Sequence, residues 1–531
     1  MKKAFVNGTI CSWEKRGNTL IVEDGKVVDF GNDLSTEGFE KIDLKGSYIY
    51  PGFVDSHMHL VNCGYTNYTA KLFDVKSMDD FSKVIHTYIK EKNLGPYDWI
   101  RGRGWNNDFF QGSKDFPTRY DLDKISKTNP IVLTRVCGHI AVCNSKVLEI
   151  LNMDSSAPYI EGGEIDVDEQ GIPTGIFREA ALERLYEIIP PPTLEEVKKM
   201  ITDTMAEMNA FGITGSHTDD FGNLPGSDWA LIIKAYQDLE KEGKLTLRVY
   251  EQCLFPSIDR YKGFLKAGYT TGVGSDYFKI GPLKLLLDGA LGARTAALRK
   301  PYHDDPGNTG ILTMEPKTLQ EWLTLARDHK MNAAIHCIGD RAMEVAMEGF
   351  QKVYGEENQN ARNSIVHCQI TDHDILESMA ENNILAMVQP IFLDYDHQIV
   401  NSRVGDTLES TSYAWKTMMD LGIHTSFGTD APVESFQPFH NIYEAVTRKT
   451  LEGKPEGGWI PDQKVSMKEA LKAYTVESAY AQFEEDTRGS LSPGQWADFM
   501  VLPKDLLHMD PEELKDLKVE ATYLGGKKVY G

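Results

Sequence analysis

Residues 48–60 read YIYPGFVDSHMHL, an apolar run that ends in two histidines separated by one residue. Alternate residues of a β-strand point to the same face, so His57 and His59 are expected to lie side by side, with Met58 on the opposite face. Two neighbouring imidazoles are typical of a metal site, but on their own they are equally compatible with chance. The other strand ends of the chain must decide between these interpretations.

Short apolar runs recur from about residue 212 onward, and amphipathic helical patterns separate many of them. The runs read GITGSHTD (212–219), LTLRVYEQ (245–252), YFKIGPLKLLLDG (277–289), NAAIHCIGD (332–340), SIVHCQI (364–370), ILAMVQP (384–390) and HTSFGTD (424–430). Counted with the first run, they give eight buried strands that alternate with helices. This pattern predicts an α/β fold with a (β/α)8 TIM-like barrel.

Two regions lie outside this pattern. Both ends of the chain contain short β-rich runs, with a hairpin signal at Asp24-Gly25 near the beginning and a Gly-Gly turn near the end. Neither end has enough strands for a sheet of its own, so we expect residues 1–50 and 482–531 to form one small β-sandwich. The barrel then spans residues 51–481. The gap after its first strand, at about residues 62–210, is too long for one connection and predicts an inserted subdomain.

The composition is that of an ordinary globular protein, with 41% hydrophobic and 25% charged residues among 531. A net charge of −23 argues against nucleic acid or an anionic membrane as the main partner. No apolar stretch approaches the ~20 residues that span a bilayer, and the first residues lack the apolar core of a secretory signal. The seven cysteines suggest neither a disulfide framework nor a CxxC zinc site. We therefore expect a cytoplasmic protein that acts on a small molecule.

Ionisable residues at the strand ends are the candidates for function, because a barrel of this type carries its active site at the carboxyl ends of its strands. Those that end the first, fifth, sixth and eighth strands are His57 and His59, His336, His367 and Asp430. Each histidine alone is more simply interpreted as a core residue whose hydrogen bonds are satisfied. Burying all of them unpaired would cost about 1–3 kcal/mol per group, and a metal ion would satisfy them together.

Lys284 lies within the fourth strand, between Leu283 and three further leucines. A lysine on a barrel strand is cut off from solvent, and burial lowers the pKa of its amine. A neutral amine can take up carbon dioxide and become a carbamate, which acts as a bridging carboxylate. The alternative is that Lys284 extends to solvent or pairs with Asp288, and spacing alone does not separate the two.

Six motifs occur along the chain between about residues 45 and 502. They are PGFVDSHMHL (51–60), KLLLDGALGARTAAL (284–298), HCIGDRA (336–342), SIVHCQ (364–369), GTDAPV (428–433) and GSLSPGQWADFMVL (489–502). In sequence and order they resemble the amidohydrolase superfamily, and more narrowly its YtcJ-like branch, which includes N-substituted formamide deformylases. Each motif is moderately specific, and the combination is highly specific.

The resemblance implies a centre of two divalent metal ions, with zinc the best match to the ligands. The ligands implied are His57, His59, Lys284, His336, His367 and Asp430. The first two histidines would hold the more buried ion together with Asp430. A carboxylated Lys284 would bridge it to the second ion, which the other two histidines hold.

By this resemblance, a metal-bridging hydroxide would attack an amide, N-formyl or cyclic amide carbonyl, with Asp430 carrying the proton to the leaving amine. The expected protein is a metal-dependent hydrolase of carbon–nitrogen bonds other than peptide bonds. The same site would also suit an esterase or lactonase. A non-catalytic binding protein that retains the barrel is the alternative from another class. A single metal with uncarboxylated Lys284 also stays open, and a homodimer is expected from the family.

Four further residues are predicted to contact the substrate. His217 ends the second strand, and Arg294 follows the fourth. Trp105 and His139 lie in the insert, in stretches similar to those of the family. The simpler interpretation of Trp105 is packing, and that of Arg294 is an ion pair at the rim of the barrel.

Overall fold

The computed structural model describes residues 2–111, 114–135, 140–153, 155–160, 163–179, 181–222, 224, 226 and 228–531. The chain divides into two compact units. The barrel unit comprises Met1–Cys63, Val197–Asn223 and Asp228–Gly531, and the insert unit comprises Gly64–Glu196 and Leu224–Ser227. None of the described helices is both long enough and apolar enough to cross a membrane.

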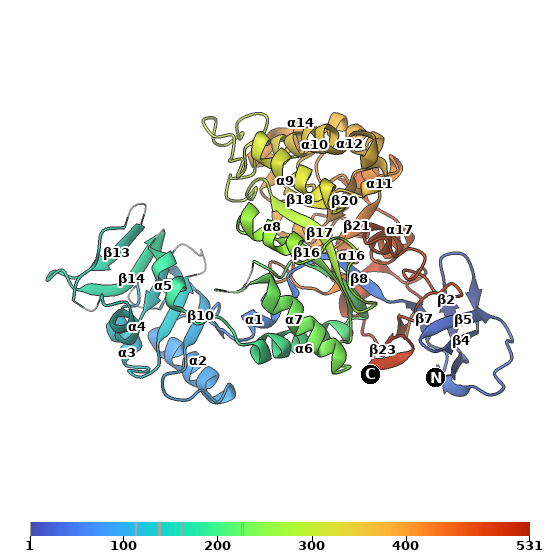
Figure 1. Cartoon of the computed structure of the whole chain (residues 1–531), viewed down its shortest axis with the longest axis horizontal. Helices are drawn as coiled ribbons and strands as arrows, with labels where there is room; N and C mark the ends of the chain where they lie inside the picture. Colours follow the sequence, from blue (N-terminus) through green and yellow to red (C-terminus); the bar gives the residue numbers. More distant parts are fainter. Residues whose placement is uncertain are drawn as a thin grey trace. The chain divides into compact units, whose positions relative to one another are not determined.

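An eight-stranded sheet forms the centre of the barrel unit, and each strand pairs in parallel with the next one along the chain. Its strands are β8 (Phe53–Met58), β15 (Ile213–Thr218), β16 (Arg248–Leu254), β17 (Phe278–Leu286), β18 (Ala333–Cys337), β19 (Ser364–His367), β20 (Leu385–Val388) and β21 (Thr425–Phe427). The first and last strands meet where the amide of Asp430 donates to the carbonyl of His57 (2.8 Å) and the hydroxyl of Thr429 donates to Asp55 (2.6 Å). The predicted (β/α)8 TIM-like barrel is confirmed (Figure 1).

The barrel strands are buried on both faces, which explains why they read as nearly continuous apolar runs in the sequence. Every residue of β8, β15, β19, β20 and β21 is buried. In β17, burial extends over Lys284 together with its leucine neighbours. The polar residues of these strands therefore need partners inside the protein.

Helices cover the outside of the sheet, and those labelled α9, α10 and α12 surround one part of it in Figure 1. The main ones are α1 (Leu60–Thr66), α6 (Leu194–Asn209), α7 (Trp229–Lys241), α8 (Ile258–Lys266), α9 (Pro316–Asp328), α10 (Asp340–Tyr354), α12 (His373–Glu381), α15 (Trp415–Asp420), α16 (Pro438–Thr447), α17 (Met467–Ala473) and α18 (Val476–Ala481). Shorter elements in the connections are η2 (Gly355–Glu357), α11 (Asn358–Ala361), η3 (Pro390–Phe392), α13 (Leu393–Asp396), α14 (Val400–Glu409), η4 (Pro461–Gln463) and η5 (Pro511–Asp516). α12 shows how these helices begin: Asp372 caps it by accepting a hydrogen bond from the amide of Ile375 (2.9 Å).

The two chain ends together form two β-sheets. One has the strand order β5-β4-β1-β6 and the other β24-β23-β22-β7-β2-β3. Their bounds are β1 (Lys2–Val6), β2 (Thr9–Cys11), β3 (Arg16–Gly17), β4 (Thr19–Glu23), β5 (Lys26–Gly31), β6 (Glu40–Asp43), β7 (Tyr48–Pro51), β22 (Phe499–Leu502), β23 (Ala521–Leu524) and β24 (Lys527–Tyr530). Phe5 packs edge-on against the stacked rings of Phe499 and Tyr523, with ring centroids 4.9 and 5.1 Å away, so residues from opposite ends of the chain share one core.

The insert unit contains its own sheet, with the order β13-β14-β12-β11-β10-β9. Its elements are β9 (Ala70–Lys71), α2 (Met78–Glu91), β10 (Ile100–Trp105), η1 (Asn107–Phe109), α3 (Arg119–Asp123), β11 (Ile131–Arg135), β12 (Ile140–Cys143), α4 (Ser145–Ile150), β13 (Gly163–Val167), β14 (Pro173–Glu179) and α5 (Leu182–Ile188). Helix α2 buries Phe81 and Ile85 against this sheet. Helix α6, which falls within the predicted insert range, belongs mainly to the barrel unit.

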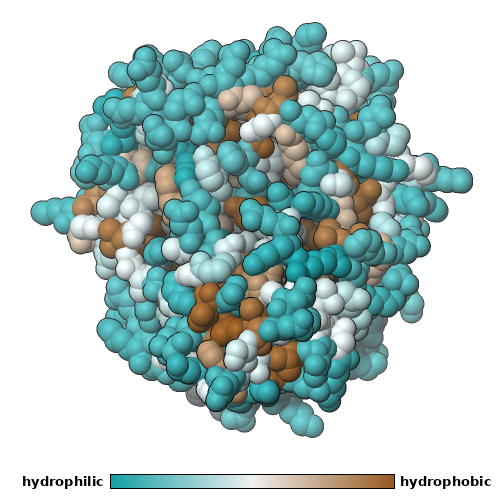
Figure 2. All heavy atoms as spheres, turned by 90° about the vertical axis from the view of Figure 1, so that its right-hand side faces the viewer, coloured by the Kyte–Doolittle hydropathy of each residue, from teal (hydrophilic) through white to brown (hydrophobic). Residues whose placement is uncertain are grey.

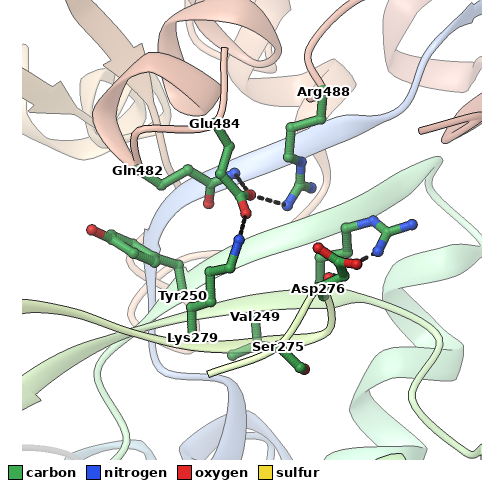
Figure 3. Close-up of a pocket in the computed structure, with 9 residues that line it drawn as sticks. Val249, Tyr250, Ser275, Asp276, Lys279, Gln482, Glu484 and Arg488 are labelled. Atoms are coloured by element: carbon green, nitrogen blue, oxygen red, sulfur yellow. Dashed lines mark hydrogen bonds and ion pairs between the residues drawn. The ribbon is translucent and has the colours of Figure 1, made fainter. Parts of the chain in front are cut away.

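Ion pairs line a small pocket at the amino end of the barrel (Figure 3). Glu484 accepts hydrogen bonds from Lys279, near the start of β17, and from Arg488. Beside them, Arg248 at the start of β16 donates to Asp498 (2.6 Å). Charged side chains from β16, β17 and the segment after α18 therefore meet at this end of the barrel. On the outer face shown in Figure 2, hydrophilic residues make up most of the surface and hydrophobic residues form separate clusters.

Candidate metal centre

The six predicted metal ligands come together at the carboxyl end of the barrel. His57 belongs to β8, Lys284 to β17, His336 to β18 and His367 to β19, while Asp430 follows β21. The sixth, His59, comes directly after β8. None of the six is exposed, and the side chain of His59 retains only 17% of its accessible surface. Residues distant in sequence thus form one buried polar cluster.

Asp430 lies at the centre of one half of this cluster. Its Oδ1 is 3.0 Å from Nε2 of His59 and 3.3 Å from Nε2 of His57. Burial alone would raise the pKa of Asp430, but its contacts with the two imidazoles hold it well below its usual range. The same carboxylate raises the pKa of His59 to about 9 against the effect of burial. A metal ion at this position would have to displace a proton from His59.

Lys284 reaches the same place from β17. Its Nζ lies 3.3 Å from Nε2 of His57, and burial lowers the pKa of its amine to about 8. Asp288, its predicted alternative partner, instead accepts hydrogen bonds from the backbone amides of Ala297, Ile338 and Gly339 at 2.8–3.0 Å. Among the described residues, no carboxylate forms an ion pair with Lys284.

His336 and His367 form the other half, with ring centroids 4.4 Å apart. Nε2 of His336 lies 3.2 Å from the carbonyl oxygen of Gly289, and Nδ1 of His367 lies 2.8 Å from Oε1 of Gln389. The ring of His367 also stacks on Phe392. Burial lowers the pKa of His336 to about 4 and that of His367 well below its usual value, so both imidazoles are neutral.

The orientation of the histidines fits a metal centre. Each has one ring nitrogen beside an oxygen acceptor, which is the arrangement that fixes the tautomer of a metal-bound imidazole. This leaves Nε2 of His57, His59 and His367, and Nδ1 of His336, to face the cluster. The ligand atoms of His57, His367 and Asp430 all lie within 4.8 Å of one another. Imidazole and carboxylate donors of this kind suit zinc and neighbouring divalent ions.

Two of the candidate ligands have a strained backbone. His367 has φ of 75° and Asp430 has φ of 58°, in the left-handed region that side chains other than glycine rarely adopt. Such conformations cost about 1–3 kcal/mol each and persist where the surroundings impose them, often at functional sites. Both side chains are thereby turned toward the cluster at the ends of their strands.

Comparison with known proteins agrees with this geometry. The sequence model of the amidohydrolase family matches residues 40–530. The chain belongs to this amidohydrolase family. It is 31% identical to a putative amidohydrolase, YtcJ, of Bacillus subtilis over 100% of this chain and 99% of that protein. It is 24% identical to the N-substituted formamide deformylase of Arthrobacter pascens, covering 98% of this chain and 97% of the relative.

The fold of this amidohydrolase also matches a solved structure over nearly its whole length. The crystal structure of an uncharacterized metal-dependent hydrolase from Pyrococcus furiosus superposes with a TM-score of 0.80 and 30% identity, covering 96% of this chain and 100% of the other. The predicted resemblance to YtcJ-like amidohydrolases is therefore confirmed. Relatives that are hydrolases support an enzymatic function for this chain.

The residues predicted to contact substrate in this amidohydrolase occupy different environments. His217 is fully buried in β15, with its ring centroid 5.2 Å from that of Tyr250. Arg294 pairs with Asp304 (2.8 Å). Trp105 is fully buried in the core of the insert unit, where its Nε1 donates to the carbonyl of Leu133. His139 lies outside the described residues, and a substrate contact for any of the four stays a prediction.

Three polar residues next to the ligands were not identified from the sequence. The carbonyl of Asp219 lies 3.0 Å from Nδ1 of His59, and Oε1 of Gln252 lies 2.7 Å from Nδ1 of His57. Gln389 holds a similar place beside His367. Asp219 and Gln252 are the last residues of apolar runs that the sequence marks as strands, and Gln389 is the last but one of its run. Their positions at strand ends could therefore have pointed to them. They were missed because the search was for ionisable side chains, whereas a glutamine side chain does not titrate and a backbone carbonyl has no sequence signature.

Proposed function

We propose that this amidohydrolase is a metal-dependent hydrolase of carbon–nitrogen bonds in amides, N-formyl amines or cyclic amides. The observation that supports it most is the convergence of three side chains inside a cluster of imidazoles. Nε2 of His57 lies 3.3 Å from Nζ of Lys284 and 3.3 Å from Oδ1 of Asp430. Burying these polar groups without partners costs free energy, and bound cations would offset that cost.

Two divalent ions, with zinc the best match, would polarise the substrate carbonyl and lower the pKa of a bound water toward ~7. Asp430 is the residue we assign to proton transfer: its carboxylate takes the proton of the attacking water and returns it to the leaving nitrogen. Its low pKa keeps it ionised and ready to accept that proton. A carboxylated Lys284 would supply a bridging carboxylate. The neutral amine is the form that reacts with carbon dioxide, and burial favours this form by lowering the pKa of Lys284 to about 8.

The substrate class rests partly on the relatives. The relative from Arthrobacter pascens is named for N-substituted formamides, so these compounds are the first to test on this chain. Esters and lactones are the second class, since the same groups would polarise their carbonyls. We also propose that the chain forms a homodimer and that it is located in the cytoplasm.

The test is metal analysis combined with a substrate panel. Protein purified without added metal should contain two divalent ions per chain, and Lys284→Ala should lose them. The purified protein should hydrolyse members of a panel of N-formyl and N-acyl amines faster than the matched esters. One ion per chain, together with a mass that shows no carboxylation of Lys284, would favour the mononuclear alternative. A metal-free chain without hydrolysis would refute the proposal and favour a binding protein.

A further inference from the structure

Two buried glutamines flank the candidate metal centre, one on each half. Gln252 lies in β16 and Gln389 follows β20, and both are nearly inaccessible to solvent. Oε1 of Gln252 is 2.7 Å from Nδ1 of His57, and Oε1 of Gln389 is 2.8 Å from Nδ1 of His367. The two imidazoles thus have the same kind of partner on the same ring nitrogen.

The amide groups of both glutamines can point only one way. Nε2 of Gln252 faces the carbonyl oxygen of Ser56 (3.2 Å) and Sδ of Met387 (3.5 Å). Nε2 of Gln389 faces the carbonyl oxygen of Met387 (3.1 Å). Carbonyl oxygens only accept hydrogen bonds, so the NH2 groups must point toward them and the amide oxygens toward the histidines.

This orientation determines the tautomers of both histidines. An amide oxygen accepts but cannot donate, so Nδ1 of each imidazole must carry the hydrogen and Nε2 must carry the free lone pair. Nε2 of His57 is the atom that faces Asp430 and Lys284. The neutral amides impose this without adding charge to the centre, unlike the carboxylates that often orient metal-bound histidines.

Met387 joins the two glutamines. Gln252 contacts its sulfur and Gln389 its carbonyl oxygen, and the residue is 1% exposed in β20. The two histidines are therefore held from a common point in the barrel. We infer that Gln252 and Gln389 are positioning residues that fix His57 and His367 as Nε2 ligands of the metal centre. This inference rests on the proposed metal-dependent function.

The experiment compares methionine and glutamate at each glutamine. Gln252→Met and Gln389→Met fill the space without an acceptor, whereas Gln252→Glu and Gln389→Glu keep an acceptor of the same length. The matched control is Gln463→Met, which removes a buried carboxamide bound to Thr417 in the helical layer. Zinc affinity is measured by competition with a chromophoric chelator, and cobalt-substituted protein reports the ligand field by visible absorption.

We expect the methionine variants to bind zinc about 10–100-fold more weakly and to show altered cobalt bands, because a partner that orients a ligand is removed. The glutamate variants should lose less affinity than the methionine variants: they keep the acceptor, although their second oxygen replaces the NH2 group that donates to a backbone carbonyl. The control should bind as the wild type does. Unchanged affinity and bands in both methionine variants would overturn the inference. Equal losses in the glutamate and methionine variants would also overturn it, because packing alone would then explain them.

Two further outcomes separate the inference from the function on which it rests. A wild-type protein that binds no zinc contradicts the proposed function itself, whatever the variants do. If a methionine variant does not fold, the glutamate variant decides alone: it must bind zinc, and its cobalt bands must shift because a carboxylate makes the imidazole a stronger donor. Unchanged bands in that variant would overturn the inference.

Discussion

Replacing Lys284 with methionine is expected to stabilise the metal-free protein while removing its metal. Methionine fills much of the volume of the lysine stem without carrying an amine. Lys284 is 1% exposed, and burial lowers the pKa of its amine from 10.5 to about 8. At pH 7 the folded protein must therefore keep a charged amine out of water, whereas the variant has none to bury.

The magnitude follows from proton linkage. A pKa lowered from 10.5 to about 8 corresponds to about 3 kcal/mol, because a tenfold change in a proton equilibrium is worth ~1.4 kcal/mol. The unfolded chain binds this proton more tightly than the folded chain does, so the cost is complete below pH 8 and absent above pH 10.5. Between pH 7 and pH 10 the wild-type protein should gain about 2–3 kcal/mol of stability from Lys284, and K284M should gain none from this position.

The assay is urea unfolding of chelator-treated protein in buffer free of carbon dioxide, at pH 7 and pH 10. The control is Lys198→Met: Lys198 is also nearly buried, but it pairs with Glu242 (2.6 Å), so its loss should destabilise the protein. The reasoning fails if K284M is less stable than the wild type at pH 7. It also fails if the variant keeps the wild-type gain in stability between the two pH values.

Four other perturbations have defined outcomes. Asp430→Asn should lower turnover by at least ~100-fold in a hydrolysis assay, as expected for loss of a proton-transfer group. Glu484→Gln should lower the free energy of unfolding by about 3 kcal/mol in urea titration, because Lys279 and Arg488 lose their buried counter-charge; activity per folded molecule should not change. Burial lowers the pKa of His217 to about 3. The wild type should therefore lose about 2–3 kcal/mol between pH 7 and pH 4.5 at this position, and His217→Gln should lose less. Chelation should abolish hydrolysis, and added zinc should restore it.

The sequence predicts the barrel well because its strands are buried on both faces. Each therefore appears as an unbroken apolar run, and the parallel order follows from the alternation with helices. The hairpin at Asp24-Gly25 is equally direct: β4 and β5 pair around it, and both residues have the positive φ that this turn requires. The ligands were recognisable because an ionisable side chain is out of place at the end of such a run.

The surroundings of the ligands could not be predicted in the same way. The position of Gln252 beside His57 depends on how neighbouring strands are staggered, and a single sequence does not specify that register. Asp288 likewise could not be placed from the sequence. It is close to Lys284 along the chain, but its carboxylate accepts hydrogen bonds from the backbone amides of Ile338 and Gly339. The lateral packing of His217 against Tyr250 likewise arises only when β15 and β16 pair.

The metal-free centre combines several unfavourable features, and this determines how stability should depend on metal. Lys284 contributes a cost of about 3 kcal/mol at pH 7, and the left-handed backbones of His367 and Asp430 add about 1–3 kcal/mol each. A metal at a free concentration of about 1,000 times its dissociation constant stabilises the fold by ~4 kcal/mol per site. The stabilisation from two such sites exceeds the free-energy cost of burying Lys284, so the order of stability should reverse. K284M should be the more stable protein without metal, and the wild type the more stable one with metal. If the variant stays more stable in saturating zinc, Lys284 does not take part in holding the metal.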